Sequence, residues 1–358
     1  MNWQDKLQET LACRRVFITG HTGFKGSWLT AWLQHYGCEI TGYSLPPETQ
    51  PNLFEMANLH EGLINHCLDD INNKDELSRQ MKKSEPELVI HLAAQSLVRR
   101  SYREPYETWS TNVMGIVNLL EAVRSCNSIK AVIVVTTDKC YENKEWAWGY
   151  REKDRLGGYD PYSASKASAE LVVSSYRKSF FCQQGPLIAS CRAGNVIGGG
   201  DWSEDRLIPD VVRAVQKDQP LIIRNPEAKR PWQHVLDCLQ GYLLLATYLM
   251  EGERDKETAF NFGPNPQDNL KVSDLLNRLQ NHWPCLKWEI ESRKNNHALH
   301  EATFLYLDSS LAKQQLNWIP KWTLDIALSK TASWYQSIMH DNTKAKYMIQ
   351  KQLTEYLT

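Results

Sequence analysis

The sequence predicts an α/β fold, a doubly wound parallel sheet followed by a smaller, mixed C-terminal region. Between Arg15 and about Ala193, short β-branched runs alternate with longer amphipathic stretches. These runs are apolar along most of their length, which is typical of strands that are covered on both faces and therefore parallel. After Gly194 the alternation fades, and Gly, Asp, Arg and Pro gather in short clusters. We therefore expect later segments to pack against the carboxyl ends of the strands, where open α/β sheets bind ligands.

The predicted elements follow one another from the first strand. Residues 16–18 (VFI) form an apolar run, and apolar side chains then recur at helical spacing from Phe24 to Tyr36. Further strands are expected at 39–43, 87–91, 131–135 and 187–189, with helices at 113–123 and within 343–358. Parallel strands joined through helices give the doubly wound arrangement.

Composition excludes several classes of protein. The chain has 358 residues, 42% of them hydrophobic and 23% charged, with a net charge of −1. A protein that follows a nucleic-acid backbone is normally basic, and the most apolar stretch, 241–250, is far short of the ~20 residues that a membrane span needs. The first fifteen residues carry charges without an apolar core, and the nine cysteines form no CxxC pair. We expect a cytoplasmic protein that binds neither nucleic acid nor membrane.

Metal binding is not expected either. The ten histidines form no HExxH motif. His297 and His300 lie three residues apart, but such a pair alone is more typical of a surface than of a metal site.

Residues 20–26 (GHTGFKG) form a GxxGxxG pattern directly after the first strand and at the start of a helix. Glycines there permit a tight turn and let backbone N–H groups approach a pyrophosphate at the helix N-terminus. The usual acidic ribose ligand after the second strand is replaced by Tyr43-Ser44, so this position does not separate NAD from NADP. Lys25 either lies near the cofactor phosphate or ribose, or is solvated.

Tyr162 and Lys166 form a Tyr-x-x-x-Lys pair just after the Gly/Pro-rich turn at 157–161. Residues i and i+4 of a helix share a face. An ammonium beside a phenol favours the phenolate and moves its pKa from ~10 toward working pH. The pair therefore predicts a base that takes a proton from a sugar hydroxyl while hydride leaves the same carbon.

Together these motifs resemble the extended short-chain dehydrogenase/reductase superfamily of nucleotide-sugar epimerases and dehydratases, from 16 to about 335. The matching segments are 19–26, 70–71, 91–95, 111–112, Tyr162 with Lys166, 192–198, 230–232 with Asp237, 261–263 and 307–324. The resemblance implies a Rossmann-type NAD-binding domain over 1–193 that carries the catalytic residues. It implies a region over 194–358 that mainly binds the nucleotide sugar, with some later segments returning to the first domain.

The same resemblance implies a set of cofactor ligands. They are Gly20, Thr22, Gly23, Phe24, Lys25, Gly26, Asp70, Ile71, Leu92, Ala93, Ala94, Thr111, Tyr162 and Lys166.

Thr137, Asp138 and Lys139 indicate the branch of the family. Plain epimerases carry small residues here and most 4,6-dehydratases carry Thr-Asp-Glu, whereas this chain has Lys139 in the third position. Together with residues 19–29 (TGHTGFKGSWL) and 148–167 (WGYREKDRLGGYDPYSASKA), this substitution most resembles the branch that acts on CDP-glucose. This implies that Tyr162 deprotonates the C4 hydroxyl as hydride passes to NAD, with Thr137 hydrogen-bonded to the developing carbonyl. Water is then eliminated across C5–C6 and hydride returns to C6, giving CDP-4-dehydro-6-deoxy-D-glucose.

The elimination step leaves alternatives open. By analogy Asp138 is the acid at the C6 oxygen, although a carboxyl next to a lysine is expected to ionise more easily. Lys139 either removes the C5 proton, which requires a pKa well below ~10.4, or holds the enolate electrostatically.

Substrate recognition is expected mainly from the second half of the chain. Two phosphates call for arginine forks and backbone donors, and Arg206 and Arg230 match family positions that clamp the diphosphate. Arg224 follows an apolar run where the family contacts the base edge. The full set implied is Gln95, Thr137, Asn195, Arg206, Arg224, Arg230 and Asn261.

Several further expectations rest on the resemblance alone. These are the choice of CDP, a homodimer or homotetramer, and a role in deoxysugar synthesis for a surface polysaccharide such as the lipopolysaccharide O-antigen. The rival readings are a dTDP- or GDP-hexose 4,6-dehydratase, a nucleotide-sugar 4-epimerase, and a catalytically idle NAD-binding protein.

Overall fold

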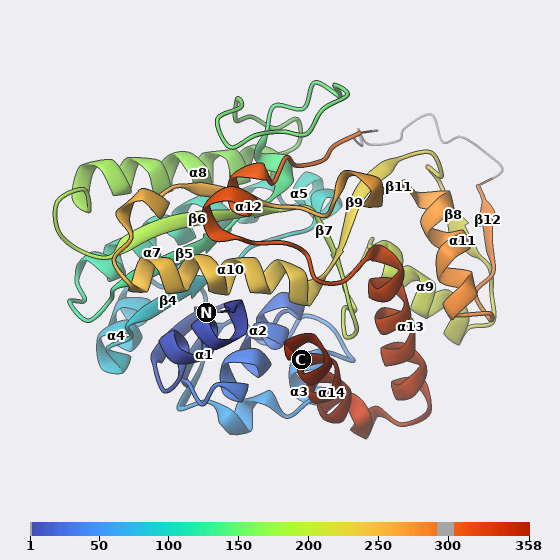
Figure 1. Cartoon of the computed structure of the whole chain (residues 1–358), viewed down its shortest axis with the longest axis horizontal. Coiled ribbons are helices and arrows are strands. Elements are labelled where there is room, and N and C mark those ends of the chain that lie inside the picture. The colour runs from blue at the N-terminus through green and yellow to red at the C-terminus, as the bar shows by residue number, and fades with distance from the viewer. Residues whose placement is uncertain (1, 292–303) are drawn as a thin grey trace.

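A seven-stranded sheet forms the centre of the computed structural model, which describes residues 2–291 and 304–358 (Figure 1). The strand order is β10-β6-β5-β4-β1-β2-β3, and each neighbouring pair is parallel. The strands are β1 (Arg15–Thr19), β2 (Glu39–Ser44), β3 (Asn65–Leu68), β4 (Leu88–His91), β5 (Ala131–Val135), β6 (Leu187–Ala193) and β10 (Ala259–Phe262). The predicted fold class is confirmed.

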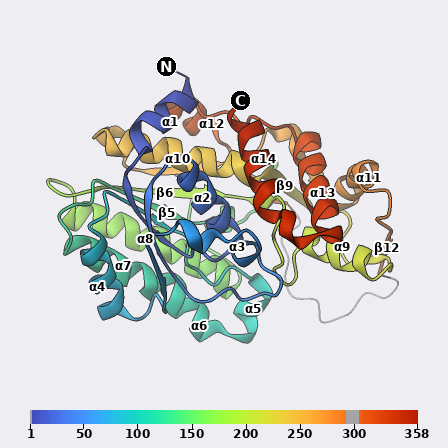
Figure 2. The same cartoon turned by 90° about the horizontal axis from the view of Figure 1, so that it is seen from below.

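Helices cover both faces of this sheet, as Figure 2 shows with the strands between two helical layers. The α-helices of the first half are α1 (Trp3–Leu11), α2 (Phe24–His35), α3 (Leu53–Met56), α4 (Lys74–Ser84), α5 (Val98–Arg103), α6 (Pro105–Trp109), α7 (Gly115–Arg124) and α8 (Pro161–Phe180). Those of the second half are α9 (Leu207–Gln216), α10 (Val235–Met250), α11 (Val272–His282), α12 (Ser310–Leu316), α13 (Leu324–His340) and α14 (Ala345–Leu357).

The alternation of side chains along each strand separates the two cores. On β1, Val16 and Ile18 lie in the cluster that includes α2 and α10, whereas Phe17 between them lies in the cluster of α4, α7 and α8. Because both faces are buried, the strands need apolar residues at nearly every position. This explains the unbroken apolar runs in the sequence.

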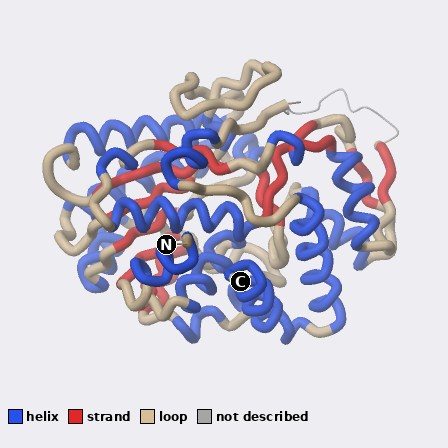
Figure 3. The backbone as a smooth tube through the Cα atoms, viewed as in Figure 1, coloured by secondary structure: helices blue, strands red, loops and turns tan. Residues whose placement is uncertain are grey.

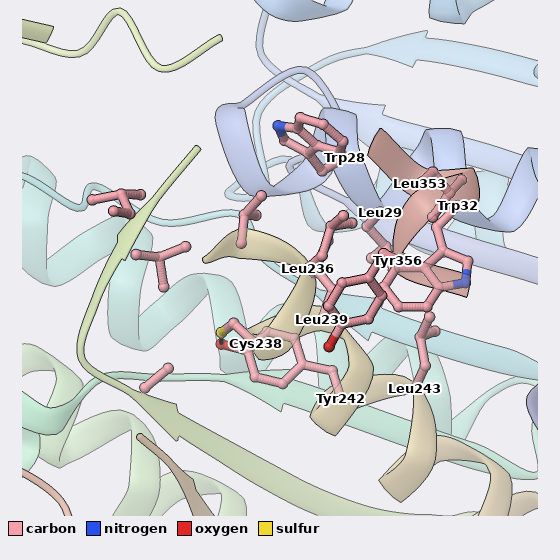
Figure 4. Close-up of a cluster of buried hydrophobic side chains, with 14 of the residues drawn as sticks. Trp28, Leu29, Trp32, Leu236, Cys238, Leu239, Tyr242, Leu243, Leu353 and Tyr356 are labelled. Carbon is pink, nitrogen blue, oxygen red and sulfur yellow. Dashed lines mark hydrogen bonds between the residues drawn. The ribbon is translucent and has the colours of Figure 1, made fainter. Parts of the chain in front are cut away.

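The C-terminal helix closes one of these cores, as Figure 4 shows. Tyr356 of α14 packs edge-on against Trp32 of α2, with 5.6 Å between ring centroids. Its hydroxyl donates to Asp237 at the start of α10, at 2.8 Å. Trp3 of α1 also packs against Tyr356, with 5.9 Å between ring centroids. The first and last helices of the chain therefore meet, and Tyr356 belongs to the core.

The later part of the chain also builds two small sheets. They are formed by β7 (Asn195–Ile197), β9 (Lys229–His234) and β11 (Asn269–Lys271), and by β8 (Leu221–Ile223) and β12 (Trp288–Ile290). Figure 3 shows these strands apart from the main sheet. Strand β10 belongs to the second half of the chain but lies in the main sheet beside β6. The main sheet therefore contains residues from both predicted domains, 1–193 and 194–358. The domain boundary at 193/194 stays a prediction.

Sequence reasoning predicted five of the seven main strands and missed two. Strand β3 (NHCL) lies at the sheet edge and is alternately half-buried and exposed, and β10 (AFNF) is four residues long. The helix expected from 113 is preceded by a π-helical turn over 110–114. Such turns are frequent at functional sites.

Across residues 2–291 and 304–358, no helix has the length and apolarity needed to cross a membrane. In the same part of the chain, no group of three or more His, Cys, Asp or Glu side chains is arranged to hold a metal ion. His297 and His300 lie outside the described residues. All nine cysteines are described, and each is an unpaired thiol.

Candidate active site

A cavity of about 850 Å³ lies at the carboxyl ends of the strands. The ends of β1, β2, β4 and β5 line one side, and segments between Ala193 and Trp232 line the other. It includes the point between β1 and β4 where the strand order reverses. Doubly wound sheets bind dinucleotides at this position.

In the glycine-rich turn, two glycines leave no space for a side chain, whereas a third has free space beside it. A Cβ atom on Gly20, whose φ is +74°, would lie 2.6 Å from the Ala93 nitrogen, and one on Gly26 would lie 2.1 Å from the Gly20 oxygen. A Cβ on Gly23 would meet nothing closer than 3.5 Å, and Gly23 caps α2. The first N–H groups of α2 can therefore approach an anion closely. The turn fits the pyrophosphate of a dinucleotide.

The ribose side of this turn is polar but lacks the usual acidic residue. Thr22 Oγ1 lies 2.8 Å from Ser44 Oγ and donates to the Leu45 carbonyl at 2.9 Å. Asp70 lines the cavity one strand further out, and its carbonyl accepts the Tyr43 hydroxyl at 3.0 Å. The hydroxyl of Ser44 stands where the acidic ligand is usual.

Lys25 does not extend into solvent. Its side chain is half-buried, and Nζ donates to the Tyr242 hydroxyl of α10 at 3.4 Å. The other predicted cofactor ligands line the same cavity, namely Phe24, Ile71, Leu92, Ala93, Ala94 and Thr111. Their roles stay predictions.

Helix α8 brings Tyr162 and Lys166 into the cavity. Asp160 caps the helix by accepting the Ser163 N–H at 2.9 Å and the Ser163 hydroxyl at 2.6 Å. A Cβ on Gly158 would lie 2.3 Å from the Ala164 nitrogen, so the preceding loop packs directly on the first turn. Tyr162 is 8% exposed and Lys166 is 4% exposed. The pair is therefore held at the cavity wall with little access to water.

Burial changes the acid–base behaviour of this pair. It raises the pKa of Tyr162 to about 12, against the opposing effects of a hydrogen bond with Thr137 and the charge of Arg206. Burial, assisted by the charge of Lys25, lowers the pKa of Lys166 to about 8. The predicted net lowering of the Tyr162 pKa by Lys166 is therefore wrong for the free protein, because loss of water penalises the phenolate and the ammonium alike.

The Thr-Asp-Lys segment forms a short 3₁₀ turn, Asp138–Cys140, directly after β5. Thr137 Oγ1 accepts the Lys139 N–H at 3.3 Å and donates to the Asp138 carboxylate at 2.9 Å. Asp138 is buried, and a Cβ on Gly194 would lie 3.1 Å from its Oδ2. The same Cβ would lie 2.6 Å from Pro231 Cγ, so a larger residue at 194 would force Pro231 to shift and would crowd the carboxyl.

Burial raises the pKa of Asp138, and this effect exceeds the opposing charge of Lys139. The expected effect of Lys139 is present, because its charge lowers the pKa of Asp138, but burial outweighs this effect and the net shift is upward. A raised pKa makes the protonated form of this carboxyl easier to reach than in free aspartic acid, and the protonated form is the one that a general acid requires.

Asn112, in the π-helical turn, joins the loop after β4 to helix α8. Its amide accepts the Gln95 N–H at 2.9 Å and donates to the Gln95 carbonyl and to Ser165 Oγ, also at 2.9 Å. The Gln95 side chain lines the cavity, but its amide already bonds to Leu97 and Thr108. Substrate binding by this side chain stays a prediction.

The predicted diphosphate ligands Arg206 and Arg230 line the cavity, and so do Arg224, which is expected at the base edge, and half-buried Asn195. Arg206 donates to Ser96 Oγ at 3.3 Å. Arg224 lies 3.9 Å from Asp205 and its side chain is 50% exposed.

Sequence reasoning missed Arg99. This residue also lines the cavity, and it pairs with the same Asp205 at 3.3 Å. Its position four residues after the HLAAQ segment (91–95) was the available signal.

Asn261 does not belong to the site. It is fully buried in β10 and does not line the cavity. Its amide donates to the carbonyls of Tyr150 and Asp308 and accepts the Tyr141 hydroxyl at 2.7 Å. The prediction of substrate binding is corrected: because β10 pairs with β6 inside the sheet, Asn261 joins structural segments.

Comparisons with known proteins agree with this architecture. The family model described as GDP-mannose 4,6 dehydratase matches residues 17–331. The chain is 48% identical over 331 residues to the CDP-glucose 4,6-dehydratase of Salmonella typhimurium, covering 90% of this chain and 91% of that protein.

Two solved structures extend the comparison. An epimerase of Methanothermobacter thermautotrophicus is 20% identical with a TM-score of 0.81, covering 96% of this chain and 97% of that one. A dTDP-glucose 4,6-dehydratase from Bacillus anthracis in complex with NAD is 23% identical with a TM-score of 0.73, covering 90% and 96%. Because the family model matches most of the chain and the Salmonella typhimurium relative is 48% identical, the chain belongs to the GDP-mannose 4,6 dehydratase family of extended short-chain dehydrogenases/reductases.

Proposed function

We propose that this protein is an NAD-dependent CDP-glucose 4,6-dehydratase, which converts CDP-D-glucose to CDP-4-dehydro-6-deoxy-D-glucose and water. The observation that carries the proposal is that the Thr137-Asp138-Lys139 turn and Tyr162 line one cavity, with Thr137 hydrogen-bonded to Tyr162. The nucleotide and the sugar come from the relative with 48% identity, whose name states that substrate.

The glycine-rich turn and α2 would hold the dinucleotide at its pyrophosphate, with Thr22, Ser44 and Asp70 on the ribose side. When bound, NAD supplies a hydride acceptor for C4 and returns the same hydride to C6. The solved relative from Bacillus anthracis holds NAD, which supports NAD over NADP here.

Tyr162 takes the proton of the C4 hydroxyl, and the Thr137 hydroxyl donates a hydrogen bond to the oxygen as it becomes a carbonyl. The phenol must ionise to do so, and Thr137 and Arg206 already favour its ionised form. Lys166, one turn along α8, supplies a further positive charge when it is protonated. Its lowered pKa of about 8 makes this charge depend on pH near neutrality.

Asp138 and Lys139 divide the elimination between them. Asp138, in its protonated form, gives a proton to the C6 oxygen, which leaves as water; burial supports this role because it raises the pKa of the carboxyl. Lys139, in its neutral amine form, takes the proton from C5, which the neighbouring 4-ketone has made acidic, and becomes an ammonium. The atoms balance because one proton and one hydroxide leave together, and C5 is reprotonated when hydride arrives at C6.

Recognition of the two phosphates falls to Arg206 and Arg230, and Arg224 contacts the edge of the nucleotide base; all three line the cavity. Two negative phosphates match charged forks that line one wall.

The finer expectations on assembly and location have separate support. Helix α8 carries the exposed apolar residues Leu171 and Phe180, 61% and 48% exposed, which supports a homo-oligomer that buries this helix. Unpaired cysteines support a reducing compartment, the cytoplasm. A role in O-antigen deoxysugar synthesis rests on the family resemblance.

Incubation of the purified protein with NAD and, separately, CDP-, UDP-, dTDP- and GDP-hexoses tests the proposal. A 4-keto sugar nucleotide, which is detected by its sensitivity to alkali, should form, and CDP-glucose should be the substrate with the highest kcat/KM. A C4 epimer would indicate the epimerase instead. Preferred turnover of a dTDP- or GDP-hexose would show that the substrate carries a nucleotide base other than cytosine. Absence of any product would overturn the proposal.

A further inference from the structure

A buried ion pair lies directly behind the catalytic residues. Glu170 follows Lys166 by one turn of α8, and its carboxylate accepts a hydrogen bond from Arg192 of β6 at 2.7 Å. It also accepts the Thr136 hydroxyl at 2.5 Å and the Ser190 hydroxyl at 2.8 Å. The pair is 4% and 3% exposed at its two side chains. A charge pair this deep is costly unless its remaining hydrogen-bonding groups are satisfied. Here both carboxylate oxygens accept hydrogen bonds, whereas the buried Nε of Arg192 has no hydrogen-bond partner among the described residues.

The arginine half extends to the other end of the catalytic turn. Arg192 Nη1 donates to the Tyr141 hydroxyl at 2.8 Å and to the Glu152 carbonyl at 2.9 Å. The Tyr141 hydroxyl in turn donates to Asn261 Oδ1 at 2.7 Å. The residue that was predicted to bind substrate is thus the far anchor of this network.

The two ends of the network bracket the catalytic turn in sequence. Thr136 immediately precedes Thr137, and Tyr141 immediately follows the 3₁₀ turn that contains Asp138 and Lys139. One side is bonded to the carboxylate and the other to the guanidinium. Because Glu170 lies on the helix that carries Tyr162 and Lys166, the ion pair connects both sets of catalytic residues.

We infer that Glu170 and Arg192 are positioning residues that set the location of the Thr137–Lys139 turn relative to Tyr162 and Lys166. For what the turn does, the inference rests on the proposed function. Misplacement of reacting groups by about 1 Å can cost on the order of 10²-fold in rate. Loss of either the Thr136–Glu170 or the Tyr141–Arg192 hydrogen bond should therefore lower kcat, while the phosphate contacts and KM stay nearly unchanged.

A purely structural ion pair makes a different prediction, and the chain provides a matched comparison. Thr136 and Ser190 each donate one hydrogen bond to the same carboxylate, on opposite oxygens. Only Thr136 is attached to the catalytic turn, because Ser190 lies within β6. Thr136→Val and Ser190→Ala therefore remove similar bonds with different consequences.

The experiment measures kcat and KM for CDP-glucose, and hydrogen exchange of the 137–141 amides by mass spectrometry. Thr136→Val and Tyr141→Phe should lower kcat by about tenfold or more, with KM within about twofold of wild type, and should speed amide exchange in 137–141. Ser190→Ala should keep kcat within about twofold and leave that exchange unchanged.

Equal kcat and exchange in all three variants and the wild type, or equal losses in Ser190→Ala and Thr136→Val, would overturn the inference. Glu170→Gln would leave the buried Arg192 charge without its carboxylate partner and could prevent folding, so the comparison does not depend on this variant. If the wild type turns over no sugar nucleotide, the proposed function fails, while the exchange measurements still decide whether the ion pair positions the turn.

Discussion

The two walls of the cavity are built in different ways. On the sheet side, Thr137, Asp138, Tyr162 and Lys166 are nearly withdrawn from water, fixed by strand ends, helix caps and buried hydrogen bonds. On the other side, arginines project from short strands and loops, and Arg224 remains half-exposed. The first wall changes the chemistry of its groups by burial, and the second supplies charge that stays in contact with solvent.

This difference separates catalysis from binding. A buried group has a pKa shifted by loss of water, as Asp138, Tyr162 and Lys166 do. A solvated arginine keeps its charge but is screened by salt. Changes to the sheet wall should therefore act on kcat, and changes to the loop wall on KM.

The largest effect is expected for Tyr162→Phe. It removes the group that takes the C4 proton, so kcat should fall by about 10³-fold with little change in KM. Single-turnover absorbance of reduced nicotinamide measures the step. Tyr176 lies further along α8, and its hydroxyl donates to Glu121 of α7. Tyr176→Phe removes this hydroxyl, is the control, and should reduce the cofactor normally. Normal reduction in Tyr162→Phe would remove this residue as the base.

Lys139→Ala should separate the two half-reactions. Elimination loses its base and should slow by about 10²-fold, while C4 oxidation remains, so that reduced cofactor accumulates. Lys130→Ala, at the opposite end of β5 and paired with Glu87, should behave as wild type. Unchanged turnover of the Lys139 variant would exclude Lys139 from the mechanism.

Asp237 shows what burial does to a carboxyl that has no catalytic role. Its pKa is raised to about 6, mainly by burial, from an ordinary value of 3.8. The folded state therefore binds more protons than the unfolded state between these values, and stability falls as pH rises through this window. The shift corresponds to about 3 kcal/mol.

Denaturation from pH 3.5 to 7 in wild type and Asp237→Asn measures this contribution, with the ends of the range set to roughly bracket both pKa values. The difference in unfolding free energy should change by about 3 kcal/mol in favour of the variant as pH rises. A constant difference would show that Asp237 ionises alike in both states.

The smallest effect is expected on the loop wall. Arg224→Ala should raise KM for CDP-glucose by about tenfold through loss of one charge-assisted contact, with kcat nearly unchanged. The effect should shrink as salt is added. Arg254→Ala, exposed and paired with Glu257 away from the cavity, is the matched control. A loss of kcat with constant KM would contradict the division between the walls.

The sequence predicted most of what the sheet wall contains. The glycine spacing, the apolar strands and the Tyr162–Lys166 pair are local patterns whose meaning depends on a few neighbouring residues. Strands β3 and β10 escaped because one is half-exposed and both are short.

Long-range consequences of folding were beyond local pattern. The net pKa shifts of Asp138 and Tyr162 depend on burial by segments far away in sequence, including Gly194 beside the Asp138 carboxyl. The role of Asn261 depends on β10 returning to the sheet. Arg99 carries the charge expected of a phosphate ligand but lies outside the segments that sequence reasoning searched for one.

The central claim is that hydrogen leaves C4 of the sugar and returns to C6 of the same molecule. CDP-glucose carrying deuterium at C4, incubated with the protein and NAD in ordinary water, tests it most directly by mass spectrometry and NMR of the product. The account predicts deuterium at C6 and a solvent-derived proton at C5. Product without deuterium at C6, or label spread into unlabelled substrate turned over in the same tube, would contradict it.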